Sequence, residues 1–399
     1  MKKLLFISHL YPRSYDPLYG MVVHRQAYEL KKLGIEVKVI SPILSIPKTL
    51  EIFKKEWRDY NSVPSTRMVE DVMVYHPRSN PIISKYYPHK SGSNLFRRTE
   101  HLIEKIYKEY PFTHIHAQTA LTNGLLALQI AKKYHVPLIT TVNATDIDQL
   151  IYRNKKCRKV MKNVLSQSDA VLTPSPIIQE KVRNRLGIDS TYIGRGIYLN
   201  ELQFEKSAVN VYKDYFVILS VSRLLPTKGI DLNMKAISLI KNKVNVPIKY
   251  LIIGEGPQKE ELKQLAKDLD ILEEDEFLGF TKKREVMEYM SFCDLFSLPS
   301  WQETFGLVYI EAMGHGKAVI GTRGHGIDGV VKHRENGLLV KEKDVIHLSE
   351  LMMFSITNKK EMIEMGKKAK NTVLQNYTWE KIALKNRDIY EKVSQKNRL

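Results

Sequence analysis

The chain has 399 residues, of which 43% are hydrophobic and 9% aromatic, and it carries a formal net charge of +18. This length is too great for one ordinary hydrophobic core, and the apolar content excludes a disordered chain. No run approaches the roughly 18 apolar residues that a membrane span needs. The two cysteines have neither metal-ligand spacing nor the density of a disulfide scaffold. We therefore expect two globular domains with free thiols in a reducing compartment.

The positive charge is concentrated in the first half of the chain. Residues 1–205 contain 31 Lys and Arg against 18 Asp and Glu, a net charge of +13, and residues 206–399 supply the other +5. One basic cluster, at 85–110, is interleaved with aromatic residues, and a second runs from 153 to 162. Such a surface suits an anionic lipid membrane or nucleic acid, and a merely solvated helix face explains it equally well.

Short apolar runs alternate with helical patterns through the first half. The runs predict buried strands and the patterns predict helices, the first of which ends at Gly34. The predicted strands cover residues 4–8, 37–41, 114–117, 138–142 and 170–173, and the predicted helices cover residues 22–33, 121–134 and 177–186. This order indicates a parallel sheet with helices on both faces.

The same alternation begins again after a looser polar stretch at 198–214. Further strands are predicted at 215–222, 248–253, 295–298 and 318–321. The sequence therefore predicts the α/β class, with two doubly wound Rossmann-like domains at 1–205 and 206–377. A last helical pattern, at about 378–399, has no strand after it, and we expect it to pack back on the first domain.

In doubly wound sheets, ligands bind at the carboxyl ends of strands, so the loops after strands are where chemistry is sought. The loop 222–229 (SRLLPTKG) offers Arg223 and Lys228 just before a helix start, an arrangement suited to a diphosphate. A solvated loop with two surface charges is the alternative. The turn 254–257 (GEGP) is small enough for a ligand to approach its backbone, but such turns are common in loops without ligands.

A third loop, 299–314 (PSWQETFGLVYIEAMG), places Glu303 before a helix and Glu311 inside it. Two carboxylates around one pocket also fit glycoside hydrolysis, in which an acid and a base or nucleophile flank the bond. The cations of the first loop favour a nucleotide sugar instead, since a hydrolase has no use for a diphosphate site. A purely structural role for Glu311 in its helix is a further alternative.

Taken together, the three loops resemble the retaining nucleotide-sugar glycosyltransferases of family 4, also called group 1. The match covers roughly residues 217–340, and 11–20, 114–118 (HIHAQ) and 140–146 (TTVNATD) match more loosely. Within the family, the chain is similar to transferases that build teichuronic acid and other surface polysaccharides. The resemblance implies the GT-B fold, with the donor in the second domain, the acceptor mostly in the first and catalysis between them.

Carried over position by position, the resemblance assigns the donor diphosphate to Arg223 and Lys228, which would neutralise the leaving group without a metal ion or other cofactor. It assigns the transferred sugar to Glu303 and the ribose hydroxyls to Glu311. The other implied donor contacts are Gly20, Gly254, Glu255, Leu278, Phe305, Gly306 and Leu307.

One position departs from the family pattern. Many members carry His where this chain has Asn143, beside the reacting sugar. Asn can donate and accept hydrogen bonds but cannot take a proton. Since the leaving phosphate of a retaining transferase is thought to deprotonate the acceptor, we predict an active enzyme in which Asn143 positions the substrates. His116 or Asp146 would partly substitute, and a structural role at a strand end is equally compatible with either residue.

The expected partners are a UDP- or GDP-sugar, a glycan or lipid-linked acceptor, and an anionic membrane surface that meets the basic region. No nucleic acid is expected as a partner, and the expected location is cytoplasmic, peripheral on the inner face of the plasma membrane. Two further functions stay open from the residues alone. One is a nucleotide-sugar 2-epimerase with the same two-domain layout, and the other is a non-catalytic module that binds an anionic surface or nucleic acid.

Overall fold

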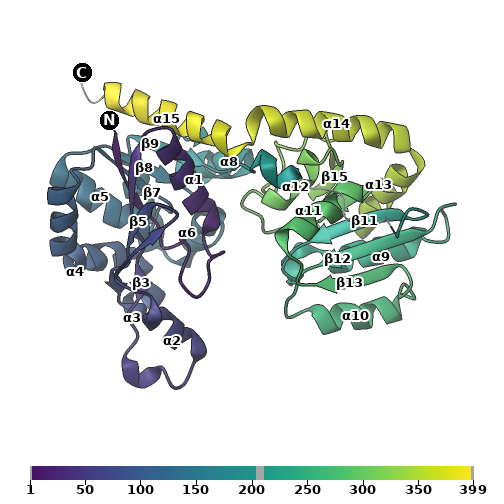
Figure 1. The fold of residues 1–399 in the computed structure, drawn as a ribbon, viewed down its shortest axis with the longest axis horizontal. Helices are drawn as coiled ribbons and strands as arrows, with labels where there is room; N and C mark the ends of the chain where they lie inside the picture. Colours follow the sequence, from purple (N-terminus) through teal and green to yellow (C-terminus); the bar gives the residue numbers. More distant parts are fainter. Residues whose placement is uncertain (1, 204–210, 397–399) are drawn as a thin grey trace. The chain divides into compact units, whose positions relative to one another are not determined.

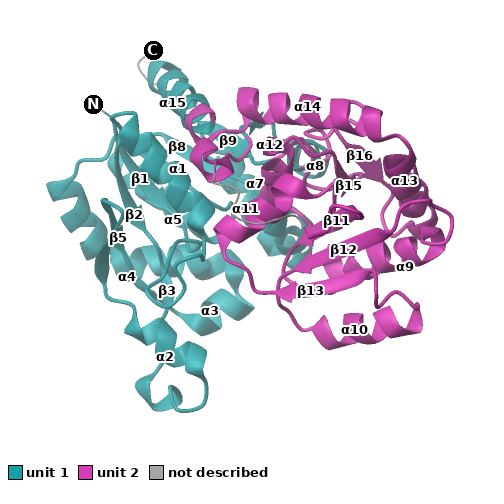
Figure 2. Ribbon diagram, turned by 45° about the vertical axis from the view of Figure 1, so that its right-hand side comes forward, with its two compact units in different colours: residues 1–174, 178–193, 382–399 teal, residues 175–177, 194–381 magenta. Residues whose placement is uncertain are grey.

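The structure, a computed structural model, describes residues 2–203 and 211–396. The chain divides into two compact units, unit 1 (residues 1–174, 178–193 and 382–399) and unit 2 (residues 175–177 and 194–381) (Figure 2). The expected domain boundary at 205/206 and the end of the last helix beyond residue 396 lie outside the described residues. Among the described residues, no helix is both long and apolar enough to cross a membrane.

Unit 1 contains an eight-stranded sheet in the order β10-β9-β8-β7-β1-β2-β5-β4, parallel except at β4 (Figure 1). Its strands are β1 (Lys3–Ile7), β2 (Glu36–Ile40), β4 (Thr66–Val69), β5 (Val72–Tyr75), β7 (His114–Ala117), β8 (Leu138–Thr141), β9 (Ala170–Thr173) and β10 (Thr191–Tyr192), with a separate pair β3 (Ile43–Leu44) and β6 (Arg78–Ser79). Its helices are α1 (Met21–Lys32), α2 (Lys55–Ser62), α3 (Pro81–Tyr86), α4 (Pro88–Glu109), α5 (Thr122–Tyr134), α6 (Ile151–Arg153), α7 (Lys155–Ser166) and most of α8 (Pro176–Leu186).

Both faces of this sheet are buried at its centre, because apolar residues occupy successive positions of β1 and side chains are buried along β7 and β8. In β1, Leu5 and Ile7 pack against α4 and α5, whereas Leu4 and Phe6 point to the opposite face, toward α1. This division follows from the two-residue period of a strand. The continuous apolar run at the start of the chain therefore specifies a central parallel strand.

The last helix, α15 (Trp379–Lys396), docks its residues from 382 onward on unit 1. Ala383 and Tyr390 belong to the same core cluster as Leu4 and Phe6. Buried side-chain amides also join this helix to unit 1. Gln118 donates to Gln26 at 3.0 Å, and Gln26 donates to Asn386 of α15 at 2.9 Å. Helix α15 thus covers the α1 face of the first sheet.

Unit 2 contains a parallel six-stranded sheet in the order β13-β12-β11-β14-β15-β16. In chain order this is the 3-2-1-4-5-6 arrangement of a doubly wound nucleotide-binding fold, whose switch point lies between β11 and β14. The strands are β11 (Phe216–Val221), β12 (Ile248–Ile253), β13 (Asp275–Gly279), β14 (Leu295–Ser297), β15 (Val319–Thr322) and β16 (Leu338–Val340). The helices are α9 (Ile230–Ile240), α10 (Lys259–Asp268), α11 (Lys283–Phe292), α12 (Leu307–Gly314), α13 (Val345–Thr357) and α14 (Lys359–Asn376).

Candidate active site

The three loops singled out in the second half follow neighbouring strands of unit 2. They leave the carboxyl ends of β12, β11 and β14, which are adjacent in the sheet. Direct contacts hold them together: Trp301 donates its backbone N–H to Thr227 at 3.0 Å, and Leu224 donates to Glu255 at 3.0 Å. The loops therefore form one edge of the sheet, at its switch point.

Glycine is required where these loops touch. A Cβ on Gly254, whose φ is 134°, would collide with the carbonyl oxygen of Ser222. A Cβ on Gly229, with φ of 69°, would lie 2.6 Å from the carbonyl oxygen of Pro299. The motif glycines therefore allow the backbones to approach closely, which is the condition for a compact phosphate-sized recess.

Lys228 and Glu303 form an ion pair across two of these loops. Their side chains are only 18% and 17% exposed, so the pair is substantially shielded from water. Arg223 behaves differently: its side chain is exposed, and none of the described residues pairs with it. The site thus contains one neutralised cation and one free cation before any ligand arrives.

Glu311 lies in the second turn of α12, buried, and pairs with Lys283 at the start of α11. Lys283 was not anticipated from the sequence, although three cations in succession at 282–284 begin that helix. Its ammonium also lies 4.0 Å from the carboxylate of Glu201. The carboxylate expected to bind ribose is therefore held in place by a lysine from a neighbouring helix.

The turn between Glu303 and α12 is built by Phe305, Gly306 and Leu307. Gly306 has φ of 85° and precedes the first helical residue, and no side chain caps the helix. Phe305 is buried, with its ring 5.8 Å from that of Tyr377. A Cβ on Gly326 would lie 2.6 Å from the nitrogen of Phe305, so this second glycine, missed in the sequence, supports the turn from behind.

Leu278 and Glu255 lie at the ends of the next two strands, β13 and β12. Glu255 pairs with Lys259 at 2.7 Å, and its carboxylate would lie 3.0 Å from a Cβ on Gly279, the residue after Leu278. The expected donor contacts of unit 2 are thus all brought to the carboxyl ends of β13, β12, β11 and β14.

A buried polar network lies directly below the switch point. Asn233 of α9 donates at 3.0 Å each to Ser220 of β11, Tyr250 of β12 and the carbonyl of Ser297 of β14. Ser297 donates back to the Asn233 amide oxygen at 2.7 Å. Because these groups are fully buried, the network ties three strands and a helix into a rigid floor.

In unit 1, Asn143 and Asp146 lie in one turn after β8. The Asp146 carboxylate accepts the backbone N–H of Asn143 at 3.1 Å and that of Ala120 at 3.2 Å, which joins this turn to the loop after β7. Burial raises the pKa of Asp146 to about 6, against the opposing effect of these backbone hydrogen bonds. Asn143 itself is half-buried, and its amide contacts the carbonyl of Gln118 at 3.4 Å.

Gly20 and His116 occupy very different settings in the same unit. Gly20 ends the loop after β1 with φ of 66°, where a Cβ would collide with the backbone of Leu10 and Tyr11. His116 is fully buried, and its ring nitrogens contact Tyr390 and Thr141, each at 2.8 Å. The structure therefore favours the structural role for His116 over substrate positioning.

The basic and aromatic region at 85–110 also separates into two parts. Ile103 and Tyr107 face the core of unit 1, Tyr107 stacking 4.1 Å from the ring of Tyr134, so these residues are not part of a binding surface. Tyr86 and Tyr87 are exposed. The sequence pattern combined exposed residues at the end of α3 with buried residues of α4, because both segments intersperse cations with apolar side chains.

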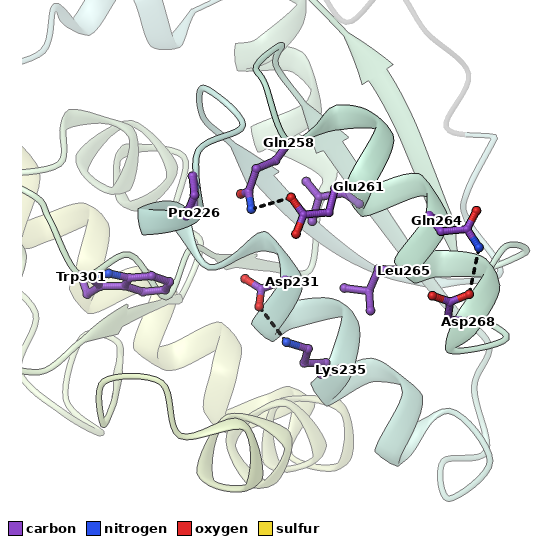
Figure 3. A pocket seen from close by; sticks show the side chains of 10 residues that line it. Pro226, Asp231, Lys235, Gln258, Glu261, Gln264, Leu265, Asp268 and Trp301 are labelled. Carbon is purple, nitrogen blue, oxygen red and sulfur yellow. Dashed lines mark hydrogen bonds and ion pairs between the residues drawn. The ribbon is translucent and has the colours of Figure 1, made fainter.

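A hollow of about 490 Å³ lies between α9, α10 and the loop of Trp301 (Figure 3). Its described lining residues are Pro226, Asp231, Lys235, Gln258, Glu261, Leu262, Gln264, Leu265, Asp268 and Trp301. Arg223, Lys228, Glu303 and Glu311 are not among them, and three of the lining residues are acidic. This hollow is therefore unsuited to a diphosphate and is distinct from the candidate site.

Comparison with known proteins supplies the family. The model of the Glycosyl transferases group 1 family matches residues 202–372, and that of Glycosyltransferase Family 4 matches residues 20–201. A relative, the putative teichuronic acid biosynthesis glycosyltransferase TuaC of Bacillus subtilis (strain 168), is 28% identical over 362 residues, or 87% of each chain.

Solved structures give the same fold. Sucrose-phosphate synthase from Thermosynechococcus elongatus matches with a TM-score of 0.77 at 19% identity, covering 99% of this chain and 100% of that one. Anabaena HepE in complex with UDP-glucose matches with a TM-score of 0.67 at 18% identity and the same coverage. The predicted GT-B fold is thereby confirmed, and with family segments that together extend from residue 20 to residue 372, the chain belongs to the group 1 glycosyltransferases of family 4.

Proposed function

We propose that the protein transfers a sugar, with retention of anomeric configuration, from a UDP- or GDP-sugar to a glycan or lipid-linked acceptor in the biosynthesis of a cell-surface polysaccharide. The observation that carries the proposal is that Arg223 and the Lys228–Glu303 pair lie in the loops after β11 and β14, at the switch point of unit 2. The names of TuaC and of the HepE complex with UDP-glucose support the acceptor class and the donor class respectively.

Lys228 and Arg223 would share the diphosphate. Arg223 has no ion-pair partner among the described residues, so a phosphate can meet its planar guanidinium without displacing anything. Lys228 is held by Glu303, and an arriving phosphate competes with that carboxylate for the ammonium. As the sugar–phosphate bond breaks, negative charge grows on the diphosphate, and the two cations would stabilise it without a metal ion.

Glu303 would then be released toward the sugar hydroxyls, while Glu311, oriented by Lys283, would accept hydrogen bonds from the ribose. Gly254, Glu255, Leu278 and the turn at Phe305, Gly306 and Leu307 would enclose the donor. In this scheme the two carboxylates bind the substrate and do not act as an acid and base pair.

The acceptor hydroxyl must lose a proton as its oxygen bonds to the anomeric carbon. We assign that proton to the leaving phosphate, on the same face of the sugar, so that no basic side chain is needed. Asn143 would position the substrates, and Asp146 would fix the turn that carries it. The burial of His116 accords with a site that does without a catalytic histidine.

A thermal-shift panel of UDP-, GDP- and ADP-sugars tests the donor assignment. A ligand that binds only the folded state stabilises it by about 2.7 kcal/mol at a hundredfold excess over its dissociation constant. We expect one nucleotide class to raise the melting temperature. If none of the sugar nucleotides raises it, the proposal is contradicted. Product analysis separates the 2-epimerase, which would convert the bound sugar without an acceptor and release no nucleoside diphosphate.

The enzyme would encounter its acceptor at the membrane surface. Unit 1 exposes Ile52, Phe53, Ile82, Tyr86 and Tyr87, each at least 49% exposed. Lys54, Lys55 and Lys85 alternate with these side chains in the sequence. Apolar side chains among cations bind the interface of an anionic bilayer. We therefore propose a cytoplasmic enzyme, peripheral on the inner face of the plasma membrane.

A further inference from the structure

The loop that leaves β1, residues 8–20, holds an arginine in an aromatic enclosure. The Arg13 guanidinium lies 4.1 Å from the ring centre of Tyr19, 5.2 Å from that of Tyr60 and 5.8 Å from that of Tyr15. It also donates to the hydroxyl of Tyr15 at 2.6 Å. The strand order places this loop at the switch point of the first sheet, between β1 and β7, where doubly wound folds bind ligands.

Two more arginines approach the same place from β4 and β6. Arg67 donates to the carbonyl of Pro12, the residue before Arg13, at 2.6 Å. Arg78 donates to the carbonyls of Tyr60 and Val63 at 2.7 and 2.6 Å. Arg78 is thereby committed to holding the end of α2, whereas Arg13 and Arg67 each contact only neutral oxygens and rings.

Within residues 2–203 and 211–396, none of the three arginines forms an ion pair with a carboxylate. His76, only 2% exposed, lies close to the same group. Burial lowers its pKa to about 4, and after the opposing hydrogen bond to Ser41 the charges of Arg67, Arg78 and Arg13 lower it further. The three arginines therefore act on this imidazole together, as like charges.

Half-buried cations without counter-charges are costly unless a ligand supplies the charge. Arg13 and Arg67 offer guanidinium donors at the same loop, since Arg67 contacts Pro12, the residue before Arg13, and guanidinium groups match phosphate oxygens geometrically. We propose that this cluster binds a phosphate or diphosphate group of the acceptor. The inference rests on the proposed function, since it names the chemistry of the acceptor that the transferase would use.

Titration calorimetry on the full chain tests the site, with the donor site first saturated by whichever nucleoside diphosphate binds it. Inorganic pyrophosphate is the probe. We expect a second, one-to-one binding event that Arg13→Gln and Arg67→Gln each weaken by at least about tenfold, the value of one charge-assisted hydrogen bond. Arg97→Gln, the same charge loss on an exposed position of α4, is expected to leave it unchanged.

Arg13→Lys is the control for misfolding, because it keeps a cation among the aromatic rings and loses only the planar guanidinium donors. This variant is expected to keep the wild-type melting temperature and to bind pyrophosphate more weakly than wild type. Farnesyl diphosphate binding more tightly than pyrophosphate would assign the phosphate to a lipid-linked acceptor, and equal affinities would assign it to a soluble one.

Three results would overturn the site: no pyrophosphate binding beyond the donor site, equal weakening by Arg97→Gln, or binding of glucuronate in preference to both diphosphates. Each leaves donor binding intact and so differs from failure of the proposed function, in which no nucleotide binds at all.

Discussion

Lys228 and Glu303 form an ion pair, although the family resemblance assigns them to different parts of the donor, the diphosphate and the sugar. Glu303→Gln removes the carboxylate that competes with phosphate for the ammonium. We expect nucleoside diphosphate affinity to stay equal to wild type or to rise, while turnover falls by about a hundredfold, since removing one polar contact that acts in the transition state has effects of this size. Calorimetry and a turnover assay separate the two quantities. A loss of nucleotide affinity would mean that Glu303 binds the nucleotide itself.

Asn143 provides a second test by substitution of a single residue. If it positions substrates, Asn143→Ala lowers turnover strongly and leaves nucleotide affinity nearly intact, because all the proposed donor contacts except Gly20 belong to the other unit. Asn143→Asp is a useful companion, since it keeps the size of the side chain and removes its donors. Unchanged turnover in Asn143→Ala would remove this residue from the site.

The buried Asp146 predicts a pH dependence. Its folded pKa of about 6 lies above the ordinary value of 3.8, so the folded state binds the proton more tightly than the unfolded state. The stability that this proton confers is full below the ordinary value and is lost as pH rises through 6. Relative to Asp146→Asn, which does not titrate, wild type should lose on the order of 2 kcal/mol between pH 4 and pH 7.

Melting temperatures of both proteins across that pH range measure the effect. A difference between them that does not vary with pH would contradict the buried, proton-binding state of Asp146. Activity need not be measured, so the result stands apart from the assignment of function.

Residue types were easier to anticipate than their partners. Arg223, Lys228, Glu303 and Glu311 follow from motifs at fixed spacing. The partner of Glu311, Lys283, belongs to a different helix, and no local pattern joins the two positions. His116 shows the converse difficulty: its sequence position at a strand end is that of a ligand, yet Thr141 and Tyr390, distant in the chain, enclose it.

Buried strands inside the sheets could be predicted closely, because in a parallel sheet both faces are covered and the apolar run is continuous. The runs at 114–117, 170–173 and 248–253 coincide with β7, β9 and β12. Short or edge strands gave no such signal. The β4–β5 hairpin turns at Glu70 and Asp71 with φ of 41° and 63°, without the Asn-Gly pair that normally announces such a turn.

The hydrogen-bond network around Asn233 joins α9 to three strands, so we expect its loss to lower the stability of the protein. Asn233→Ala leaves the buried hydroxyls of Ser220, Ser297 and Tyr250 with fewer partners, and each buried unsatisfied group costs about 1–3 kcal/mol. We expect a marked fall in melting temperature. Ser238→Ala, on the same helix but with only a local hydrogen bond, should have little effect. Equal effects would mean that the network adds no more than a surface contact.

For the molecule as a whole, the membrane proposal depends on unit 1. Ile52 and Phe53 are 79% and 69% exposed beside Lys54 and Lys55. Replacing both apolar residues with Ser should reduce flotation with anionic vesicles, and high salt should reduce it further by screening the lysines. Leu272→Ser, at a 56% exposed position of unit 2, is the matched control. Equal binding of wild type to neutral and anionic vesicles would contradict the proposal.

The two units also differ in how far the sequence predicts their candidate binding residues. In the proposed function, unit 2 would bind a component common to many enzymes, and its loops follow a pattern of fixed spacing. Unit 1 would recognise one acceptor, and its candidate residues, Arg13 and Arg67 among them, come from loops and edge strands far apart in the chain. Only the fold brings them together, which is why no local sequence pattern predicts an anion site at Arg13 and Arg67.

The most direct test of the account is titration calorimetry of UDP, GDP and ADP against wild type, Lys228→Ala and Lys267→Ala. One of the three nucleotides is expected to bind wild type and Lys267→Ala equally, because Lys267 is exposed at the far end of α10. Lys228→Ala should bind it at least about tenfold more weakly, through loss of a charge-assisted contact. The account is contradicted if no nucleotide binds wild type, or if Lys228→Ala binds as wild type does.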